Sequence, residues 1–443
     1  MADRTARNFL LVTATRIALW SLWFLAIIII CRQLGKTGVG IYTICEAIIK
    51  IMWSCLGNPL DLAVLRRVPI YLRSDRPRAL NIIRSAFLAR IAFGGAAFAG
   101  ILLLSDHLSL WFMAGIDPGT LFILTGFGVI GDLLSRSVLN YFQATEAFGR
   151  YVLIETVVQV GRFVLIVTLA CTDNLTVQTA VGSYVVMAYV GFLFGICLLP
   201  RDIFGKSLAH RADIIEILHF SKWIISGMVI AALYERMDVL MLGRFWTPDE
   251  VGIYATAFKL AMLPELLVWC LSTIFYPRVV DLYRTDKFIS WVKNYLKLAL
   301  PLGAIAVTAS LLLGDIAITI IFDGEFPESV QPFYLLVIGM FVWLVLAPLP
   351  MALLALVAPK KIVAITSFQL VLMFAGGVLL IGQFGFMGAA ILIMSVRILI
   401  GFVIFILAWK VAKTKSLVNI DETPVQTVNS VMDRENTELE QEH

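Results

Sequence analysis

Basic side chains recur inside long apolar stretches of this 443-residue chain. Those that we single out as candidates for a binding site are Arg16, Lys50, Arg162, Arg236, Lys259 and Arg397. An ionisable group inside a membrane span is costly, and by default it marks a polar interior, a substrate path or a partner. The arginine guanidinium offers a planar fork of donors that suits phosphate and carboxylate. The excess of basic over unpaired acidic residues therefore predicts a cavity that favours an anion.

Acidic residues in the same stretches have two interpretations. Glu46 precedes Lys50 by four residues, and Asp132 precedes Arg136 by four, the order that favours an ion pair within one helix. Other acids have no such partner nearby, and they are candidates for coupling transport to H⁺ or Na⁺: Asp61, Glu155 and Glu265. Pairing with a basic residue of another helix is the alternative for each of these three.

The basic residues have alternatives of the same kind. Three arginines fall in the third of their stretch that is nearest the inner surface of the membrane: Arg16, Arg90 and Arg136. From there a long side chain can reach the lipid headgroups. Lys259 can reach outward in the same way, and Arg236 has acids on both sides that can neutralise it.

The composition sets the class of protein that must position these side chains. Hydrophobic residues make up 60% of the chain and charged residues 15%, whereas a soluble domain has about 25% charged residues. A membrane helix needs about 20 apolar residues, and twelve stretches qualify. They are 9–31, 39–63, 83–104, 120–142, 152–171, 177–199, 219–243, 252–276, 298–321, 331–357, 362–382 and 388–411. We expect an all-α polytopic membrane protein. The six cysteines all lie in apolar stretches without metal-ligand spacing, so we expect no metal and no cofactor.

An internal repeat divides these stretches into two sets of six. On an offset of 212 positions, Arg32 matches Arg244, and Val39-Gly40-Ile41-Tyr42 matches Val251-Gly252-Ile253-Tyr254. Arg66 and Arg278, and Tyr71 and Tyr283, match on the same offset. Parallel repeats are common in transporters, so we predict two six-helix bundles, 1–205 and 206–415, around a central cavity.

The loop charges predict the orientation. One side carries 23 Lys and Arg residues and the other only Arg32, Lys36 and Arg244. Because basic loops stay in the cytoplasm, both termini are placed there. The segment 416–443 has seven acids and one base, and we expect it to be a disordered cytoplasmic tail.

The short turn between the first two helices of each half resembles that of a known family. Its residues are Leu34-Gly35-Lys36-Thr37-Gly38-Val39-Gly40-Ile41-Tyr42, and Leu242-Gly243 followed by Val251-Gly252-Ile253-Tyr254 in the second half. With twelve helices in two bundles, this pattern resembles the Wzx-like oligosaccharide flippases of the MOP (MATE-like) superfamily. The resemblance covers residues 1–415.

The resemblance implies a flippase of the cell inner (cytoplasmic) membrane, not an enzyme. Its substrate would be an undecaprenyl-pyrophosphate-linked oligosaccharide for lipopolysaccharide O-antigen or another surface polysaccharide. Arg16, Lys50, Arg236 and Lys259 lie in helices comparable to those that hold the pyrophosphate in related flippases. Membrane lipids, a polysaccharide polymerase and glycosyltransferases are the expected partners, with no nucleic acid. A drug/cation antiporter of the same fold is the first alternative. A polytopic glycosyltransferase or ligase is the second, and the short outer loops count against it.

Overall fold

A computed structural model describes residues 2–113, 115, 118–204, 222–265, 282, 287–349 and 359–414. Every regular element in these residues is helical, which confirms the predicted all-α class. Eight of the helical segments are long and apolar enough to cross a membrane, so the chain is a multi-pass membrane protein. The count of twelve spans stays a prediction, since 205–221 and 266–281 fall outside the described residues.

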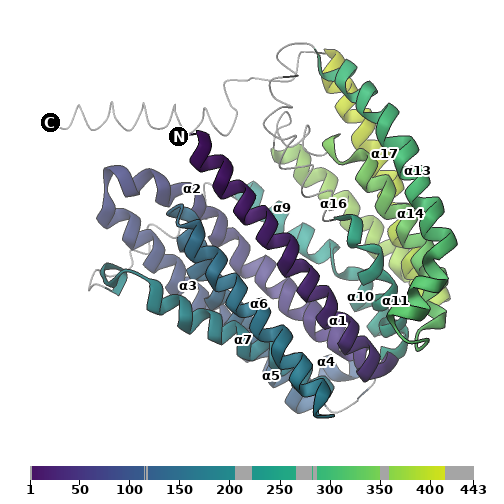
Figure 1. Cartoon of the computed structure of the whole chain (residues 1–443), viewed down its shortest axis with the longest axis horizontal. Coiled ribbons are helices and arrows are strands. Elements are labelled where there is room, and N and C mark those ends of the chain that lie inside the picture. Colours follow the sequence, from purple (N-terminus) through teal and green to yellow (C-terminus); the bar gives the residue numbers. More distant parts are fainter. Residues whose placement is uncertain are drawn as a thin grey trace.

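The helices form two groups (Figure 1). The first group comprises α1 (Ala2–Met52), η1 (Trp53–Gly57), α2 (Asn58–Ser74), α3 (Arg76–Leu103), α4 (Ser105–Phe112), α5 (Pro118–Ala144), α6 (Phe148–Cys171), α7 (Val177–Leu198) and η2 (Arg201–Phe204). The second comprises α9 (Lys222–Tyr234), α10 (Met237–Phe245), α11 (Pro248–Ala261), α13 (Phe288–Ile321), η3 (Pro327–Ser329), α14 (Val330–Leu346), α16 (Pro359–Gly376), η4 (Gly377–Ile381) and α17 (Gly382–Thr414). The predicted boundary at 205/206 and the acidic tail 416–443 lie outside the described residues.

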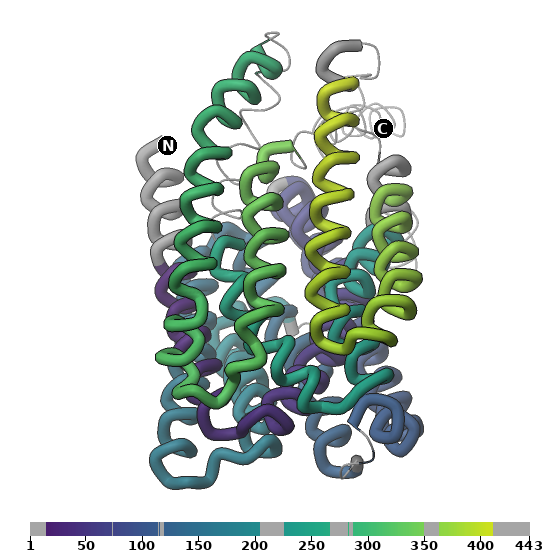
Figure 2. Tube along the Cα trace, turned by 90° about the vertical axis from the view of Figure 1, so that its right-hand side faces the viewer, coloured from purple at the N-terminus to yellow at the C-terminus, as the bar shows by residue number. Residues whose placement is uncertain are grey.

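The two groups meet at one end and spread apart toward the other. In Figure 1 they come together near α1, α10 and α11, and they diverge toward the end that holds the N-terminus. Figure 2, turned by 90°, shows the second group in front, with α13, α14, α16 and α17 running side by side along the vertical of the view.

Two glycines produce sharp bends in otherwise continuous helices. Gly35 has φ 62° inside α1, and Gly385 has φ 54° inside α17. A residue with a Cβ rarely adopts this left-handed conformation, whereas glycine does so without steric cost. Both bends fall between stretches that we predicted as separate helices. The predicted helix 219–243 is not continuous, because the backbone forms a turn at Glu235 and Arg236 between α9 and α10.

The repeated Val-Gly-Ile-Tyr segments lie where the two groups cross. A Cβ on Gly40 would lie 1.8 Å from the carbonyl oxygen of Pro248, and a Cβ on Gly252 would lie 2.0 Å from that of Lys36. Lys36 and Pro248 are themselves related by the repeat offset of 212. At the crossing of α1 and α11, each helix therefore contacts the other through equivalent positions of the repeat. Both copies require glycine there, because a Cβ would collide with the backbone of the other helix.

The outer faces of the helices are apolar. In α13 the side chains of Leu298, Leu312 and Ile320 are 66%, 72% and 67% exposed. In water such a surface would be a liability, but lipid tails are as apolar as leucine. The exposed leucines and isoleucines of α13 are thus explained by contact with the bilayer.

A charged cavity between the two helix groups

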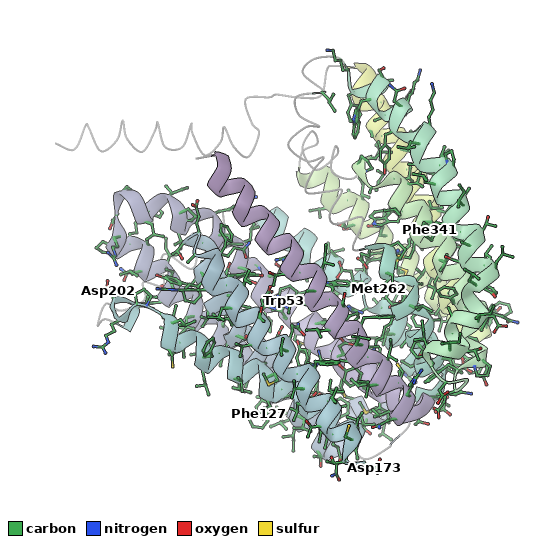
Figure 3. The ribbon with its side chains drawn as sticks, viewed as in Figure 1. Trp53, Phe127, Asp173, Asp202, Met262 and Phe341 are labelled. Carbon is green, nitrogen blue, oxygen red and sulfur yellow. The ribbon has the colours of Figure 1, made fainter. Side chains whose placement is uncertain are left out.

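A cavity of about 560 Å³ lies between the two groups. Residues of α1, α5, α6 and α7 line it on one side, and residues of α10 and α11 line it on the other. Met262, directly after α11, marks the side of the second group that faces the first (Figure 3). The charged lining residues are the basic Arg16, Lys50, Arg136, Arg162, Arg236 and Lys259 and the acidic Glu46, Asp132, Glu155 and Glu265. Six cations face four carboxylates, so the described lining is net positive.

Glu46 lies between lysines of both groups. Its Oε1 accepts a hydrogen bond from Lys50 Nζ at 2.7 Å, one helical turn further along α1, which confirms the predicted ion pair. Its Oε2 lies 3.6 Å from Nζ of Lys259 on α11. Lys259 also donates to Thr43 Oγ1 at 3.3 Å. Because Glu46 and Lys259 are only 7% and 6% exposed, water screens this contact weakly.

Arg162 on α6 is buried without a carboxylate partner among the residues that the structure describes. Its guanidinium donates to the hydroxyl of Tyr42 and lies 5.1 Å from the centre of the Tyr184 ring. Its Nε has no hydrogen-bond partner in the described part of the chain. A buried cation that is held only by neutral groups is suited to an external anion.

Two further networks line the first group's side of the cavity. Arg16 donates to Tyr151 Oη at 3.1 Å, and Tyr151 donates to Glu155 Oε1 at 2.9 Å.

Asp132 belongs to the second network. It accepts from Tyr184 Oη at 3.0 Å and from Arg136 Nε at 3.4 Å, the second predicted ion pair. The Arg136 guanidinium also lies 4.1 Å from the centre of the Trp53 ring. These bonds fix the charged groups in place, so the cavity is a pre-organised polar site.

The structure brings most of the predicted site residues together. Five of the six basic candidates line the cavity: Arg16, Lys50, Arg162, Arg236 and Lys259. Arg397 is not among the lining residues in the described part of the chain, and its guanidinium contacts Met340. The functional roles of all six remain predictions.

The three acids predicted for ion coupling are placed differently. Glu155 and Glu265 line the cavity, and Oε2 of Glu265 is buried without a partner among the described residues. Asp61 lies elsewhere and is not an unpaired acid, because Arg90 donates to it and Asn140 Nδ2 lies 3.1 Å from its Oδ1. No sequence signal connected Asp61 with Arg90, since 29 positions separate the two.

Sequence reasoning missed the polar residues that hold the arginines. Tyr42, Tyr151 and Tyr184 each bond a charged lining residue. Tyr42 could have been found, because it ends the repeated Val-Gly-Ile-Tyr segment. Tyr151 and Tyr184 carry no such signal.

Contacts at the closed end join the two groups beyond the cavity. Lys36 forms an ion pair with Glu328 at 2.7 Å, and Thr37 donates to Asp249. Arg32 donates to the carbonyl oxygens of Ile320 and Ile321 at 2.7 and 2.8 Å. We call these contacts, together with the Gly40–Gly252 crossing, the closure. Its polar bonds join the first group to the second at this end.

Comparison with known proteins identifies the family. Residues 5–283, more than half of the chain, match the family described as polysaccharide biosynthesis protein. The chain belongs to this family. It is also 20% identical over 376 residues to the "Probable low-salt glycan biosynthesis flippase Agl15" of Haloferax volcanii, covering 84% of this chain and 76% of that protein.

The solved structures confirm the predicted MOP-type fold. An inward-facing multidrug resistance MATE transporter of the MOP superfamily superposes with a TM-score of 0.70 at 16% identity, covering 92% of this chain and all of that one (100%). The lipid II flippase MurJ, in an inward closed conformation, gives a TM-score of 0.69 at 12% identity and covers 89% and 87%. At these identities the likeness concerns the fold alone.

Proposed function

We propose that the protein is a flippase that moves a lipid-linked oligosaccharide from the inner to the outer leaflet of the cytoplasmic membrane. The carrier would be undecaprenyl pyrophosphate, and the product would serve synthesis of a surface polysaccharide such as O-antigen. The observation that carries the proposal is the net positive cavity between the helix groups, with Arg162 buried and lacking a carboxylate partner among the described residues. Family membership and the flippase relative support the same class of substrate.

The proposed transport mechanism uses the cavity between the two groups. The excess of Lys and Arg in one set of loops supports a cytoplasmic location for the diverging end of the two groups. The cavity would then be reached from the leaflet in which lipid-linked sugars are assembled. The pyrophosphate binds Arg162 and Lys259, Lys50 adds positive charge nearby, and the lipid tail stays in the bilayer. A volume of about 560 Å³ lies in the range of small-molecule sites, so a long glycan extends through the opening. Release outward requires the closure to break and the diverging end to close.

Transport driven by H⁺ or Na⁺ would use Glu155 or Glu265, the predicted coupling acids that line the cavity. Both termini would lie in the cytoplasm. Polymerase and glycosyltransferases would act on either side of the transport step, as its consumer and its supplier.

The test is translocation of a fluorescent undecaprenyl-pyrophosphate oligosaccharide in proteoliposomes. Wild type is expected to transport it, and Arg16→Ala, Lys50→Ala, Arg236→Ala and Lys259→Ala are expected to slow transport while still inserting in the membrane. Normal transport by all four variants would show that the substrate binds at other residues. No transport of any lipid-linked sugar, together with ion-driven efflux of small cations, would instead establish the drug antiporter that the MATE-like fold also allows.

A further inference from the structure

Glu46 occupies a special place among the acids of the cavity. Among the described lining residues it is the carboxylate that lies within 4 Å of cations from both helix groups, at 2.7 Å from Lys50 and 3.6 Å from Lys259. The other ion pair of the lining, Asp132–Arg136, stays within α5. Glu46 is therefore part of the link between the groups, as well as part of the lining.

The two bonds of Glu46 are unequal. The contact with Lys50 has the length of a strong charge-assisted hydrogen bond. The contact with Lys259 is longer than a hydrogen bond, and Nζ of Lys259 donates to Thr43 and lies 5.1 Å from the centre of the Tyr42 ring. Lys259 thus keeps donor capacity for a better acceptor. Of the two lysines, it is the one that an incoming anion can take from Glu46.

The surroundings of Tyr42 show where such an anion would bind. Arg162 donates to the Tyr42 hydroxyl, and Lys259 lies against the Tyr42 ring, so cations from both groups converge on one side chain. An anion that bound both would lie close to Glu46, and like charges at this range repel strongly where water is scarce. Glu46 and the bound anion would therefore compete for Lys259.

We propose that Glu46 is an internal counter-anion, which holds Lys259 across the cavity until an anionic group of the substrate replaces it. The inference rests on the proposed function and adds a coupling step to it. In the empty protein, Glu46 joins α1 to α11 next to the closure. A bound pyrophosphate takes Lys259 and leaves Glu46 to Lys50 alone. The direct link from α1 to α11 through Glu46 is then lost, and the anion joins Lys259 to Arg162 on α6 instead. A ligand shifts a conformational equilibrium only through such a difference in contacts between states.

The first experiment measures binding of farnesyl pyrophosphate to the purified protein, with farnesol as the control for tail binding. Removing the competing anion in Glu46→Gln is expected to lower the Kd about tenfold, which corresponds to about 1.4 kcal/mol. Glu155→Gln is the matched comparison, because it removes a lining carboxylate that binds Tyr151 instead of a lysine. We expect its effect on the Kd to be less than threefold.

A second readout is the closure itself. Cys31 is fully buried, and its Sγ lies 3.9 Å from Thr256 Oγ1 of the other group, so it becomes reactive when the groups separate. With the other cysteines replaced, farnesyl pyrophosphate should speed Cys31 labelling in wild type, and Glu46→Gln should label fast without ligand. If Glu46→Gln does not fold, Glu46→Asp keeps the charge near Lys50 but shortens the reach to Lys259, and it should bind about threefold tighter than wild type.

The outcomes separate the two proposals. Wild-type binding with an unchanged or weaker Kd in Glu46→Gln overturns the counter-anion role and leaves the flippase standing. An equal gain in Glu46→Gln and Glu155→Gln also overturns it, since a general change in cavity charge would then suffice. Absence of pyrophosphate binding in wild type overturns the inference together with the proposed function.

Discussion

Substituting Gly252 by alanine tests the closure where α1 and α11 cross. The added Cβ would lie 2.0 Å from the carbonyl oxygen of Lys36 and 2.8 Å from its carbonyl carbon. Real Cβ atoms do not approach backbone that closely, and a backbone carbonyl cannot rotate away like the end of a side chain. The helices α1 and α11 must move apart, so Gly252→Ala is expected to disfavour the state described here.

The size of the effect follows from the contact. To reach even 3.0 Å the two backbones must separate by about an ångström, and forcing one extra carbon into a well-packed site typically costs about 1–3 kcal/mol. If that cost applies only to the closed state, the ratio of open to closed protein rises about fivefold to 150-fold. Gly40→Ala should behave alike, because its Cβ would meet the carbonyl of Pro248 at 1.8 Å.

The assay is labelling of Cys31 by a thiol reagent that does not cross the membrane, with the other cysteines replaced. Gly182→Ala is the control, since a Cβ there would meet nothing within 4 Å and alanine is the better helix former. We expect fast labelling in Gly252→Ala and wild-type labelling in Gly182→Ala. Equal protection of Cys31 in both variants, at unchanged thermal stability, would refute the crossing as the element that holds the closed state.

Three further changes test other contacts. Glu328→Gln breaks the ion pair with Lys36, whose two side chains are 32% and 44% exposed. We therefore expect the closed state to lose at most about 1 kcal/mol, with a two- to fivefold rise in Cys31 labelling. A rise as large as that of Gly252→Ala would contradict this. Arg90→Met leaves the Asp61 carboxylate, which is 14% exposed, without its buried cation. The change should cost about 3–5 kcal/mol of stability, seen as early thermal unfolding, and Arg90→Met/Asp61→Leu should recover most of it. Arg162→Gln should slow flipping at least tenfold, since a charge-assisted hydrogen bond contributes about 1.5–3 kcal/mol. Arg162→Lys should keep part of the rate. An equal loss of rate in both variants would point to packing against Tyr184 instead of charge.

Much of the architecture could be predicted because it depends on local patterns. Apolar length identifies helices, and the Gly35 bend falls in the short turn that the repeat marks. The ion pairs Glu46–Lys50 and Asp132–Arg136 were predictable because a four-residue spacing places both groups on one helix face.

The rest depends on contacts between distant segments. Lys259 reaches Glu46 across 213 positions, and Arg162 reaches Tyr42 across 120. The break at Glu235–Arg236 was also missed, because the apolar pattern continues through it. The pattern of residues within one helix does not show which face of another helix that helix will contact.

The repeat shows why the partners of the cavity charges in particular could not be predicted. On the offset of 212, Glu46 corresponds to Phe258, Lys50 to Met262, Arg162 to Phe374, and Lys259 to Ala47. The symmetric residues, Gly40 with Gly252 and Tyr42 with Tyr254, are those that shape the crossing. Even there the bonds differ, since Tyr42 accepts from Arg162 and Tyr254 donates to Asp238. Two halves that separate and close again need matching backbones at their contact, but a substrate with one charged end needs charges that the halves do not share. We therefore expect transplanting Lys259 to its symmetric position, as Ala47→Lys with Lys259→Ala, to restore the charge of the cavity without restoring transport.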